Sequence, residues 1–334
     1  MNKIILCAIE TSCDETSVAF VQDGNVLLSQ VTHSQIQSHQ VYKGVMPELA
    51  SRLHIQVISQ VIDSALVQAN LTWNEVDAIA FTIGPGLVGS LHVGALAAKT
   101  LAWALNKPLI GVNHLAGHIH ANAFVKDIKY PCLALVVSGG HTELIMMQGP
   151  LDFNILSQTQ DDAIGEAYDK VGRLLGLNYP AGPYIDQLAK EGKSTYPVPH
   201  LKIEKTSFSY SGIKSHFNNL IHNATQKNEE INLEDMCATF QDIAISQIIE
   251  RLDYAIEQHQ PKQVIIAGGV SANSYLRTQS SNLMKAYPNI DFSIPPIMYC
   301  TDNAAMIGAA AYHYYLEKRF VSLNAKVNPG LTLA

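Results

Sequence analysis

Residues 3–22 read KIILCAI-ETSCDET-SVAFVQ, and this stretch decides the fold. An apolar run, a small polar turn and a second apolar run predict two adjacent strands, and Asp23-Gly24-Asn25 predicts a reversal after them. The pattern returns in residues 132–150, as CLALVV, SGGHT, ELIMMQ and Gly149-Pro150. Identity between the two stretches is slight. The shared pattern nevertheless predicts a duplication, with one such hairpin opening each of two lobes.

The segments after each hairpin alternate between helical and strand patterns. Apolar residues recur at helical spacing from Ile55 onward, and an alanine-rich helix is predicted for Val88–Leu105. Further helices are predicted for residues 161–175, for residues 234–258 and from near Asp302, the last with small residues on one face. Strands are predicted at DAIAFTI (77–83), PLIGV (108–112) and QVIIA (263–267), and an irregular segment through SFSYSGIKS (207–215). Such alternation indicates an α/β fold with buried, largely parallel strands.

Length and composition indicate a two-lobed globular protein. The chain has 334 residues, of which 47% are hydrophobic and 15% charged. A chain of this length is too long to fold around one ordinary hydrophobic core. We expect a first lobe of residues 1–130, completed by a C-terminal helix in 302–334, and a second lobe of residues 131–301. Residues 78–98 carry no charge, but Gly84-Pro85-Gly86 favours a strand, a turn and a helix over a membrane span. We therefore expect a cytosolic protein.

Charge and cysteine content exclude some classes. The five cysteines are scattered without a C-x-x-C motif, which argues against a disulfide framework or a zinc ribbon. The net charge is −7, whereas a stand-alone nucleic-acid binder usually has a basic face. If the protein acts on RNA, it needs a local basic patch or partner subunits that supply cations.

Two histidines form a candidate metal site. His114 and His118 are four residues apart, so on a helix they share one face and could bind one divalent metal. Asp302 is a candidate third ligand, although an aspartate at a helix start is more often an N-cap. His120 is interpreted as a surface residue or one behind the ligands. Leu115 occupies the position where the gluzincin motif has its catalytic glutamate.

Other polar turns are candidate binding or catalytic sites. Asp14 and Glu15 follow a buried strand and could hold a metal or accept a proton, or form a solvated turn. Ser138-Gly139-Gly140 offers backbone amides for an anion. The Gly268–Asn273 turn could let a ligand approach the backbone, with Ser271 or Asn273 as a helix cap. Asp169, beside Lys170, would ordinarily be half of an exposed ion pair.

Ten segments occur together in an order that resembles one protein family. They are IETSCDETSVA, PELASRLH, GPGLVGSLHVG, NHLAGH, LVVSGGHTEL, GEAYDKVGRLLGL, YPAGPYID, FSYSGIKS, GGVSAN and TDNAAMIG. The chain resembles, from Ile4 to about Ala310, the bacterial form of the tRNA adenosine threonylcarbamoyltransferases, once named O-sialoglycoprotein endopeptidases. The resemblance implies the two-lobed actin/Hsp70/sugar-kinase fold, with duplicated lobes and mixed central sheets. Lys43, where the family often has glycine, and Ile213, where leucine is frequent, are the departures.

The resemblance also implies a reaction and its partners. Threonylcarbamoyl-AMP, made by a separate synthase, would donate its threonylcarbamoyl group to N6 of the adenosine 3′ of the anticodon, in tRNAs that read codons beginning with A. A homologous pseudo-enzyme subunit and a small ATPase would help to build the tRNA site. ATP, ADP or AMP could occupy the cleft that holds the donor.

The family's functional residues have counterparts in this chain. The metal ligands match His114, His118 and Asp302, and such a set suits Fe²⁺, with Zn²⁺ and Mn²⁺ as alternatives. We interpret Asp14 or Glu15 as the group that accepts the amine's proton. The nucleotide contacts match nine positions, which are Val136, Val137, Ser138, Gly139, Gly140, Asp169, Gly182, Asp186 and Asn273.

Three alternatives remain open. A small-molecule kinase of the same fold would explain the hairpins but not the histidine pair. A metallopeptidase would explain the pair but lacks the adjacent glutamate. An ATP-gated scaffold, which is not an enzyme, would need no bound transition metal.

Overall fold

The computed structural model describes residues 3–198 and 204–333, which form two compact units. Unit 1 comprises the described residues as far as Ile128, together with Gln148–Phe153 and Pro295 onward. Unit 2 comprises Lys129–Met147 and the described part of Asn154–Ile294. The C-terminal residues thus belong to the same unit as the N-terminal hairpin.

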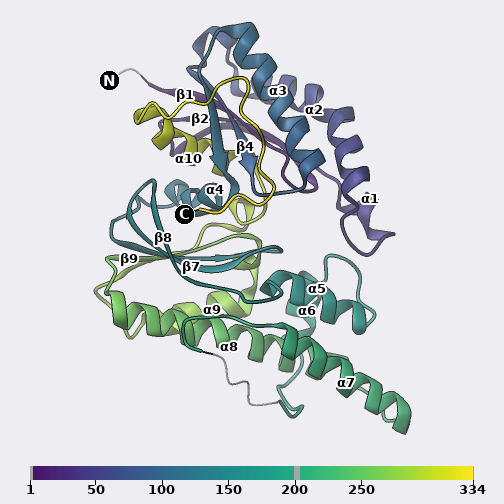
Figure 1. Ribbon diagram of the computed structural model, residues 1–334. Helices are drawn as coiled ribbons and strands as arrows, with labels where there is room; N and C mark the ends of the chain where they lie inside the picture. The colour runs from purple at the N-terminus through teal and green to yellow at the C-terminus, as the bar shows by residue number, and fades with distance from the viewer. Residues whose placement is uncertain (1–2, 199–203, 334) are drawn as a thin grey trace. The chain divides into compact units, whose positions relative to one another are not determined.

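Each unit contains a five-stranded mixed sheet built on one plan (Figure 1). In unit 1 the order is β3-β2-β1-β4-β5, where β1 pairs antiparallel with β2 and parallel with β4. In unit 2 the order is β10-β9-β6-β7-β8, where β6 pairs antiparallel with β7 and parallel with β9. The strands are β1 (Ile5–Glu10), β2 (Glu15–Gln22), β3 (Val26–Ser34), β4 (Ala78–Gly84), β5 (Leu109–Asn113), β6 (Cys132–Val137), β7 (Thr142–Gly149), β8 (Asp152–Gln158), β9 (Gln263–Ala267) and β10 (Asp291–Ser293). The predicted α/β class, with duplicated hairpins and mixed sheets, is confirmed.

Helices cover both faces of the unit 1 sheet. Alternate residues of β1 point to opposite faces, so Leu6 and Ala8 pack on α10 while Cys7 and Ile9 pack on α2 and α3. The helices and short 3₁₀ turns of this unit are α1 (Ile36–Gln40), α2 (Pro47–Ala69), η1 (Trp73–Glu75), α3 (Val88–Leu105), α4 (His114–His120), η2 (Ala121–Phe124), η4 (Ile297–Tyr299) and α10 (Ala304–Leu316). The unit 1 sheet is therefore buried on both sides.

Small residues let α10 lie close to the unit 1 sheet, as the sequence predicted. A Cβ on Gly308 would fall 2.5 Å from Cγ2 of Val21 and 3.4 Å from Cβ of Ala8. Any larger residue at this position would push the helix away from β1 and β2. The close approach fixes the start of α10, and with it the position of the residues just before the helix.

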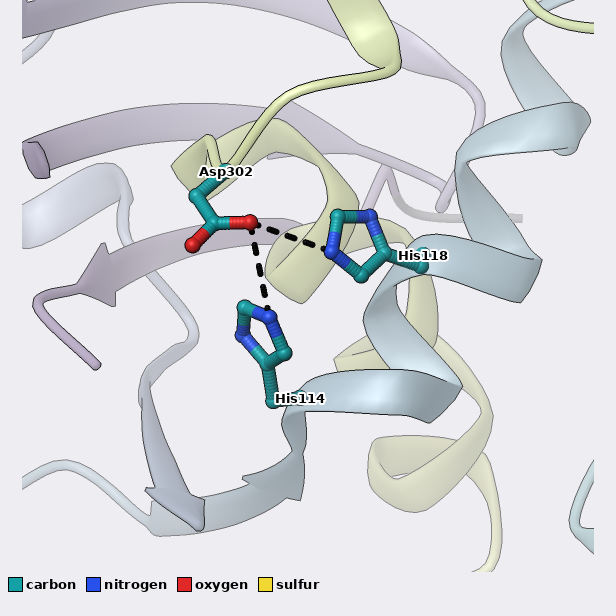
Figure 2. Close-up of side chains that lie close together, drawn as sticks. All are labelled: His114, His118 and Asp302. Atoms are coloured by element: carbon teal, nitrogen blue, oxygen red, sulfur yellow. Dashed lines mark hydrogen bonds and ion pairs between the residues drawn. The ribbon is translucent and has the colours of Figure 1, made fainter. Parts of the chain in front are cut away.

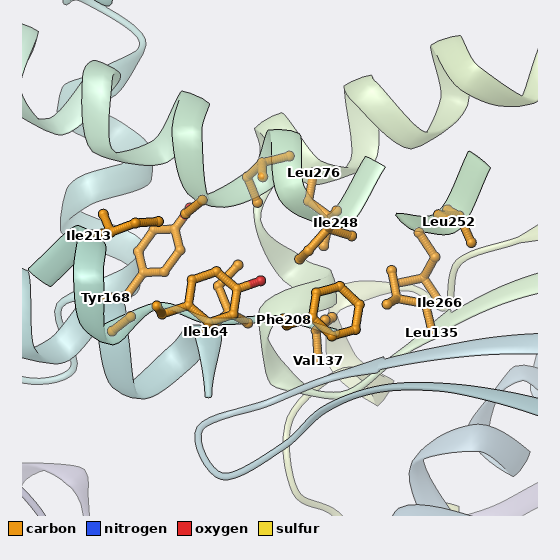
Figure 3. Packing of buried hydrophobic residues seen from close by; sticks show 14 of the residues in the cluster. Leu135, Val137, Ile164, Tyr168, Phe208, Ile213, Ile248, Leu252, Ile266 and Leu276 are labelled. Atoms are coloured by element: carbon orange, nitrogen blue, oxygen red, sulfur yellow. The ribbon is translucent and has the colours of Figure 1, made fainter. Parts of the chain in front are cut away.

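In unit 2 the core fills the space between one face of the sheet and its helices (Figure 3). Leu135 and Val137 of β6 point into this core, where they meet Phe208, Ile248 and other buried side chains. The helices and 3₁₀ turn are α5 (Ile164–Leu174), α6 (Gly182–Ala189), α7 (Ser211–Lys227), α8 (Leu233–His259), η3 (Gly269–Ala272) and α9 (Ser274–Met284). The core anchors the end of β6, where the first polar turn of unit 2 begins.

The irregular segment predicted through residue 215 was wrong in its second half, because α7 begins at Ser211. The start of α7 is stabilised from a distance. The carboxylate of Asp161 accepts hydrogen bonds from the backbone N–H of Tyr210 at 2.8 Å and from the hydroxyls of Ser209 and Ser211 at 2.6 Å. A cap from about fifty residues upstream leaves no local pattern, so it could not be predicted from the sequence.

The uncharged stretch of residues 78–98 forms β4, a turn and most of α3, as predicted. By length and composition alone, α3 is apolar enough to cross a membrane. Its buried residues, among them Leu91, Ala95 and Ala98, instead pack in the core beside the unit 1 sheet. This packing is that of a helix that buries one face against a sheet.

Candidate metal centre and nucleotide-binding loops

The two histidines of the candidate metal site lie on a short, fully buried helix, α4. The side chain of Asn113 caps the helix by accepting hydrogen bonds from the N–H groups of Leu115 at 2.8 Å and Ala116 at 3.4 Å. Gly117 allows close packing, because a Cβ there would lie 2.8 Å from Cδ1 of Ile307 in α10. The cap and the contact with α10 fix the direction in which the histidines point.

His114, His118 and Asp302 converge at one point (Figure 2). One carboxylate oxygen of Asp302, Oδ1, lies 3.1 Å from Nε2 of His118 and 3.5 Å from Nε2 of His114. One ligand atom from each residue falls within 4.8 Å of the others. The N-cap interpretation of Asp302 is wrong, because Asn303 caps α10 by accepting the N–H of Met306.

A fourth charged group lies behind His114. Glu10, at the end of β1, is fully buried, and its Oε2 lies 3.1 Å from Nδ1 of His114. Burial by itself would raise the pKa of the Glu10 carboxyl, but the neighbouring His114 lowers it below its usual range. Glu10 was not among the site residues predicted from the sequence.

The electrostatics of this cluster suit a bound cation. Burial tends to lower the pKa of His114, yet Asp302 and Glu10 outweigh it and hold that pKa well above its ordinary value. Burial and the nearby His114 lower the pKa of His118. Burial would raise the pKa of Asp302, but the two imidazoles keep it far below its usual range. The buried carboxylate of Glu10 and the partly exposed carboxylate of Asp302 thus lie against the histidine pair, where a divalent metal would supply positive charge.

Asp14 and Glu15 lie in the turn that follows β1 and at the start of β2. Asp14 is buried and Glu15 is partly buried. Burial, followed by the charges of Asp14 and Asp302, raises the pKa of Glu15 well above its usual value. The charge of Asp302 thus acts on Glu15, which follows Asp14 in the chain.

His54 of α2 holds this turn in place. Its Nδ1 accepts a hydrogen bond from the hydroxyl of Thr16 at 2.7 Å, and its Nε2–H donates to the carbonyl oxygen of Cys13 at 2.9 Å. Asp14 and Glu15 lie between these two contacts in the chain. His54 ends the family segment PELASRLH, and no role was predicted for it. Its contacts with the turn are seen only in the folded unit.

His120 differs from its interpretation as a surface residue or one behind the metal ligands. It is fully buried, its Nε2–H donates to the carbonyl of Pro150 at 2.8 Å, and its ring lies 4.6 Å from that of His313. Burial, followed by His313, lowers the pKa of His120 to about 3. His120 is a neutral core residue.

In unit 2, Ser138, Gly139 and Gly140 form the tip of the β6–β7 hairpin, directly after Val136 and Val137. The turn closes through a hydrogen bond from the N–H of Ser138 to the carbonyl of His141 at 2.8 Å. Both glycines are exposed, and a Cβ on either would meet nothing within 4 Å. The backbone of this tip is therefore accessible to a ligand.

Two glycines from other segments lie against the hairpin tip. A Cβ on Gly165 of α5 would fall 2.7 Å from the carbonyl oxygen of Ser138, and one on Gly268 would clash with the backbone of Val137. Unit 1 repeats the second contact, because a Cβ on Gly86 would lie 2.6 Å from the carbonyl oxygen of Ser12. The turn after β4 thus lies against the β1–β2 hairpin in unit 1, and the turn after β9 lies against the β6–β7 hairpin in unit 2.

The remaining predicted nucleotide contacts lie in α5, in α6 and at the start of α9. Asp169 of α5 accepts the N–H of Ala181 at 2.8 Å, and Gly182, which has open space around it, follows in the chain. Asp186 accepts both the N–H and the hydroxyl of Ser274, at 3.1 and 2.9 Å. Asp169 and Asp186 therefore order the segments around Gly182 and the start of α9.

Asn273 has a structural role as well as its predicted one. Its Oδ1 accepts the N–H of Leu276 and caps α9, so the predicted cap is confirmed. Its Nδ2 donates to Oε1 of Gln241 at 2.7 Å and lies 3.4 Å from the hydroxyl of Tyr168. The nucleotide role of Asn273 stays a prediction, and Gln241 and Tyr168 are supporting residues that the sequence did not reveal.

Comparisons with known proteins identify one family. Residues 26–309 match the family model TsaD, described as tRNA N6-adenosine threonylcarbamoyltransferase. A protein of that name from Listeria welshimeri is 50% identical over 335 residues, which cover 99% of this chain and 97% of the relative. Another from Geobacillus thermodenitrificans is 48% identical, covering 100% of this chain and 98% of the relative.

Solved structures support the fold alone. Component A of (R)-2-hydroxyglutaryl-CoA dehydratase from Acidaminococcus fermentans is similar with a TM-score of 0.57 at 13% identity, over 95% of this chain and 99% of that one. Full-length HypF gives a TM-score of 0.60 at 13% identity, over 94% of this chain and 55% of that one. These likenesses agree with the duplicated α/β architecture.

Proposed function

This chain belongs to the family of tRNA N6-adenosine threonylcarbamoyltransferases, and on that basis we propose that it transfers a threonylcarbamoyl group from threonylcarbamoyl-AMP to N6 of the adenosine 3′ of the anticodon. The tRNAs would be those that read codons beginning with A. The observation that carries the proposal is a likeness of 48–50% identity over nearly the whole length of curated relatives that bear this name.

We assign the metal to His114, His118 and Asp302. Two nitrogen donors and one carboxylate are a common ligand set for Fe²⁺, Zn²⁺ and Mn²⁺, and Fe²⁺ is our first expectation. When bound, such a metal supplies positive charge that polarises a carbonyl oxygen of the donor. The three residues leave positions for water or substrate, as catalytic metal sites require.

The nucleotide part of the donor would be bound by the loops of unit 2. The backbone N–H groups around Ser138–Gly140 offer hydrogen bonds to phosphate, and both glycines leave the backbone accessible. The segments ordered by Asp169, Asp186 and Asn273, together with Gly182, would bind the ribose and base. ATP, ADP or AMP would bind to the same loops, and the chain contains no G-x-x-x-x-G-K-[ST] motif that would suggest another mode.

In the proposed reaction, one bond forms and one breaks. The N6 amine of adenosine attacks the carbamoyl carbon, a new N–C bond forms, and the bond from that carbon to the phosphate oxygen breaks, releasing AMP. The amine loses one proton. Asp14 or Glu15, in the turn after β1 and at the start of β2, would accept it.

We further propose that the chain acts in the cytosol with protein partners. Its net charge of −7 leaves it short of the cations that dominate affinity for tRNA. A homologous pseudo-enzyme subunit and a small ATPase would complete the tRNA site, and a separate synthase would deliver the donor. Affinity for tRNA should therefore rise when the partners are added and should fall steeply with salt.

The test is reconstitution of the reaction. Unmodified tRNA, threonine, bicarbonate, ATP, the synthase, the partner subunits and this chain are incubated together, and the tRNA nucleosides are analysed by mass spectrometry. We expect threonylcarbamoyladenosine only in tRNAs that carry adenosine 3′ of the anticodon, and none when His118→Ala replaces the wild-type chain.

The rival functions give other outcomes. A small-molecule kinase would consume ATP and phosphorylate a metabolite in the absence of tRNA. A metallopeptidase would cleave glycoprotein without ATP or synthase, and would lose that activity in His118→Ala. An unmodified adenosine in the full mixture, together with either of these activities, would overturn the transferase proposal.

A further inference from the structure

His114 is oriented by the residues around its second ring nitrogen. Its Nε2 faces Asp302, whereas its Nδ1 lies 3.1 Å from Oε2 of Glu10 and 3.1 Å from Oγ of Ser12. A neutral imidazole carries one N–H, and only the nitrogen without it can bind a metal. An ionised carboxylate accepts hydrogen bonds but cannot donate them, so Glu10 keeps the proton on Nδ1 and leaves the Nε2 lone pair available.

Glu10 is itself held rigidly. It is fully buried, its Oε1 accepts the backbone N–H of Ser12, and its Oε2 accepts the hydroxyl of Thr82 in the neighbouring strand β4. The two carboxylate oxygens are therefore fixed by the turn after β1 and by β4. A carboxylate with this support can set the direction of the ring that contacts it.

His118 provides a contrast. Its Nε2 contacts Asp302 at 3.1 Å, but its Nδ1 is buried and has no hydrogen-bond partner within residues 3–198 and 204–333. Of the two histidines, only His114 has a carboxylate behind it. The two ligands are thus unequal, and His114 is the one whose orientation depends on another side chain.

We propose that Glu10 is a positioning residue that fixes the tautomer and the direction of His114 for metal binding. The inference rests on the proposed metal site and extends it beyond the three ligands. Loss of a carboxylate behind a metal-binding histidine typically weakens metal affinity by about 10–100-fold. Glu10 would therefore set how tightly the metal is held, without touching the metal.

The experiment measures the binding of Co²⁺ and Zn²⁺ by the full chain, with Glu10→Gln and Glu10→Ala as variants. Glutamine keeps the shape and one acceptor oxygen but removes the charge, and its amide cannot accept from both Ser12 and Thr82. We expect Glu10→Gln to bind Zn²⁺ about tenfold more weakly in competition with a chelator, and Glu10→Ala up to about 100-fold more weakly. The absorption spectrum of bound Co²⁺ should also change in both variants, because the ligand geometry changes.

Glu143→Gln is the matched control. Glu143 is also a buried carboxylate near the tip of a hairpin, but it lies in β7 of unit 2, whereas the three proposed metal ligands belong to unit 1. The Glu143→Gln variant should bind Zn²⁺ as tightly as the wild type does. Thermal unfolding of each metal-free variant shows which proteins fold, and Glu10→Gln keeps the test usable if Glu10→Ala does not.

The outcomes separate this inference from the metal site itself. If the wild type binds neither Zn²⁺ nor Co²⁺, the proposed metal site is wrong. If the wild type binds them and folded Glu10→Gln and Glu10→Ala show the same affinity and the same Co²⁺ spectrum, the metal site stands and the role of Glu10 is refuted. Lower stability with unchanged affinity would equally refute it, because it would show a structural role alone.

Discussion

Replacing Gly268 with alanine should destabilise the protein through one backbone contact. Gly268 has φ 89° and ψ 166°, a conformation that is open to glycine but strained for other residues. A Cβ there would clash with the carbonyl group of Val137, at the end of β6. The backbone strain costs about 1–3 kcal/mol and the forced shift of packed neighbours about 1–3 kcal/mol more.

We therefore expect Gly268→Ala to lower the free energy of unfolding by about 2–6 kcal/mol, which corresponds to a fall in melting temperature of roughly 4–24 °C for a unit of this size. Gly269→Ala is the matched control, because a Cβ at that neighbouring position would meet nothing within 4 Å. The control should stay within about 0.5 kcal/mol of the wild type. The assay is urea unfolding followed by circular dichroism.

The comparison of the two variants decides the argument. If Gly268→Ala unfolds at the same urea concentration as Gly269→Ala, the contact with Val137 does not hold the hairpin tip. If it unfolds earlier and the folded protein also binds an ATP analogue more weakly, the turn supports the proposed phosphate site as well.

Three further changes test separate features of the chain. Burial lowers the pKa of His54, so the unfolded chain takes up a proton on this residue at a higher pH than the folded protein does. The free energy of unfolding should therefore fall as the pH drops below about 6.5. Urea unfolding at two pH values should show a smaller fall in His54→Gln than in the wild type. Lys43 has φ 55°, a left-handed backbone conformation that glycine adopts with less strain than lysine. Lys43→Gly should therefore raise the free energy of unfolding by about 0.5–1 kcal/mol. A decrease would show that the backbone of Lys43 is not strained. Asp186→Ala should weaken the binding of an ATP analogue at least about tenfold in calorimetry. Ser274→Ala, which removes a hydrogen-bond partner of Asp186 but keeps its carboxylate, should weaken the binding less. Equal affinities in the two variants would exclude contact between Asp186 and the nucleotide.

Local patterns predicted the elements of this fold well. The apolar runs around ETSCDET and SGGHT predicted both hairpins, and the structure places each first strand at the centre of its sheet. The start of α7 was missed because Asp161, far away in the chain, caps it. The strand β10, which pairs with β9, has only three residues, too few to show an apolar or alternating pattern in the sequence.

The candidate site was predictable only in part. The spacing of His114 and His118 indicated a shared helix face, and helical geometry brings them together without help from the rest of the chain. Asp302 was a candidate from its place at a helix start, but only the family resemblance favoured it over an N-cap, because its approach depends on the packing of α10 against α4. Glu10 could not be distinguished from Asp14 and Glu15 before the structure showed which acid faces His114.

The most direct measurement of the central claim is the rate of threonylcarbamoyladenosine formation as a function of bound metal. The full reconstituted mixture is run with wild-type chain stripped of metal, with the same chain reloaded in steps, and with Asp302→Ala. We predict that product on the adenosine 3′ of the anticodon rises in proportion to metal bound per chain and stays absent in Asp302→Ala. A metal-free wild type that forms this product at the full rate would contradict it.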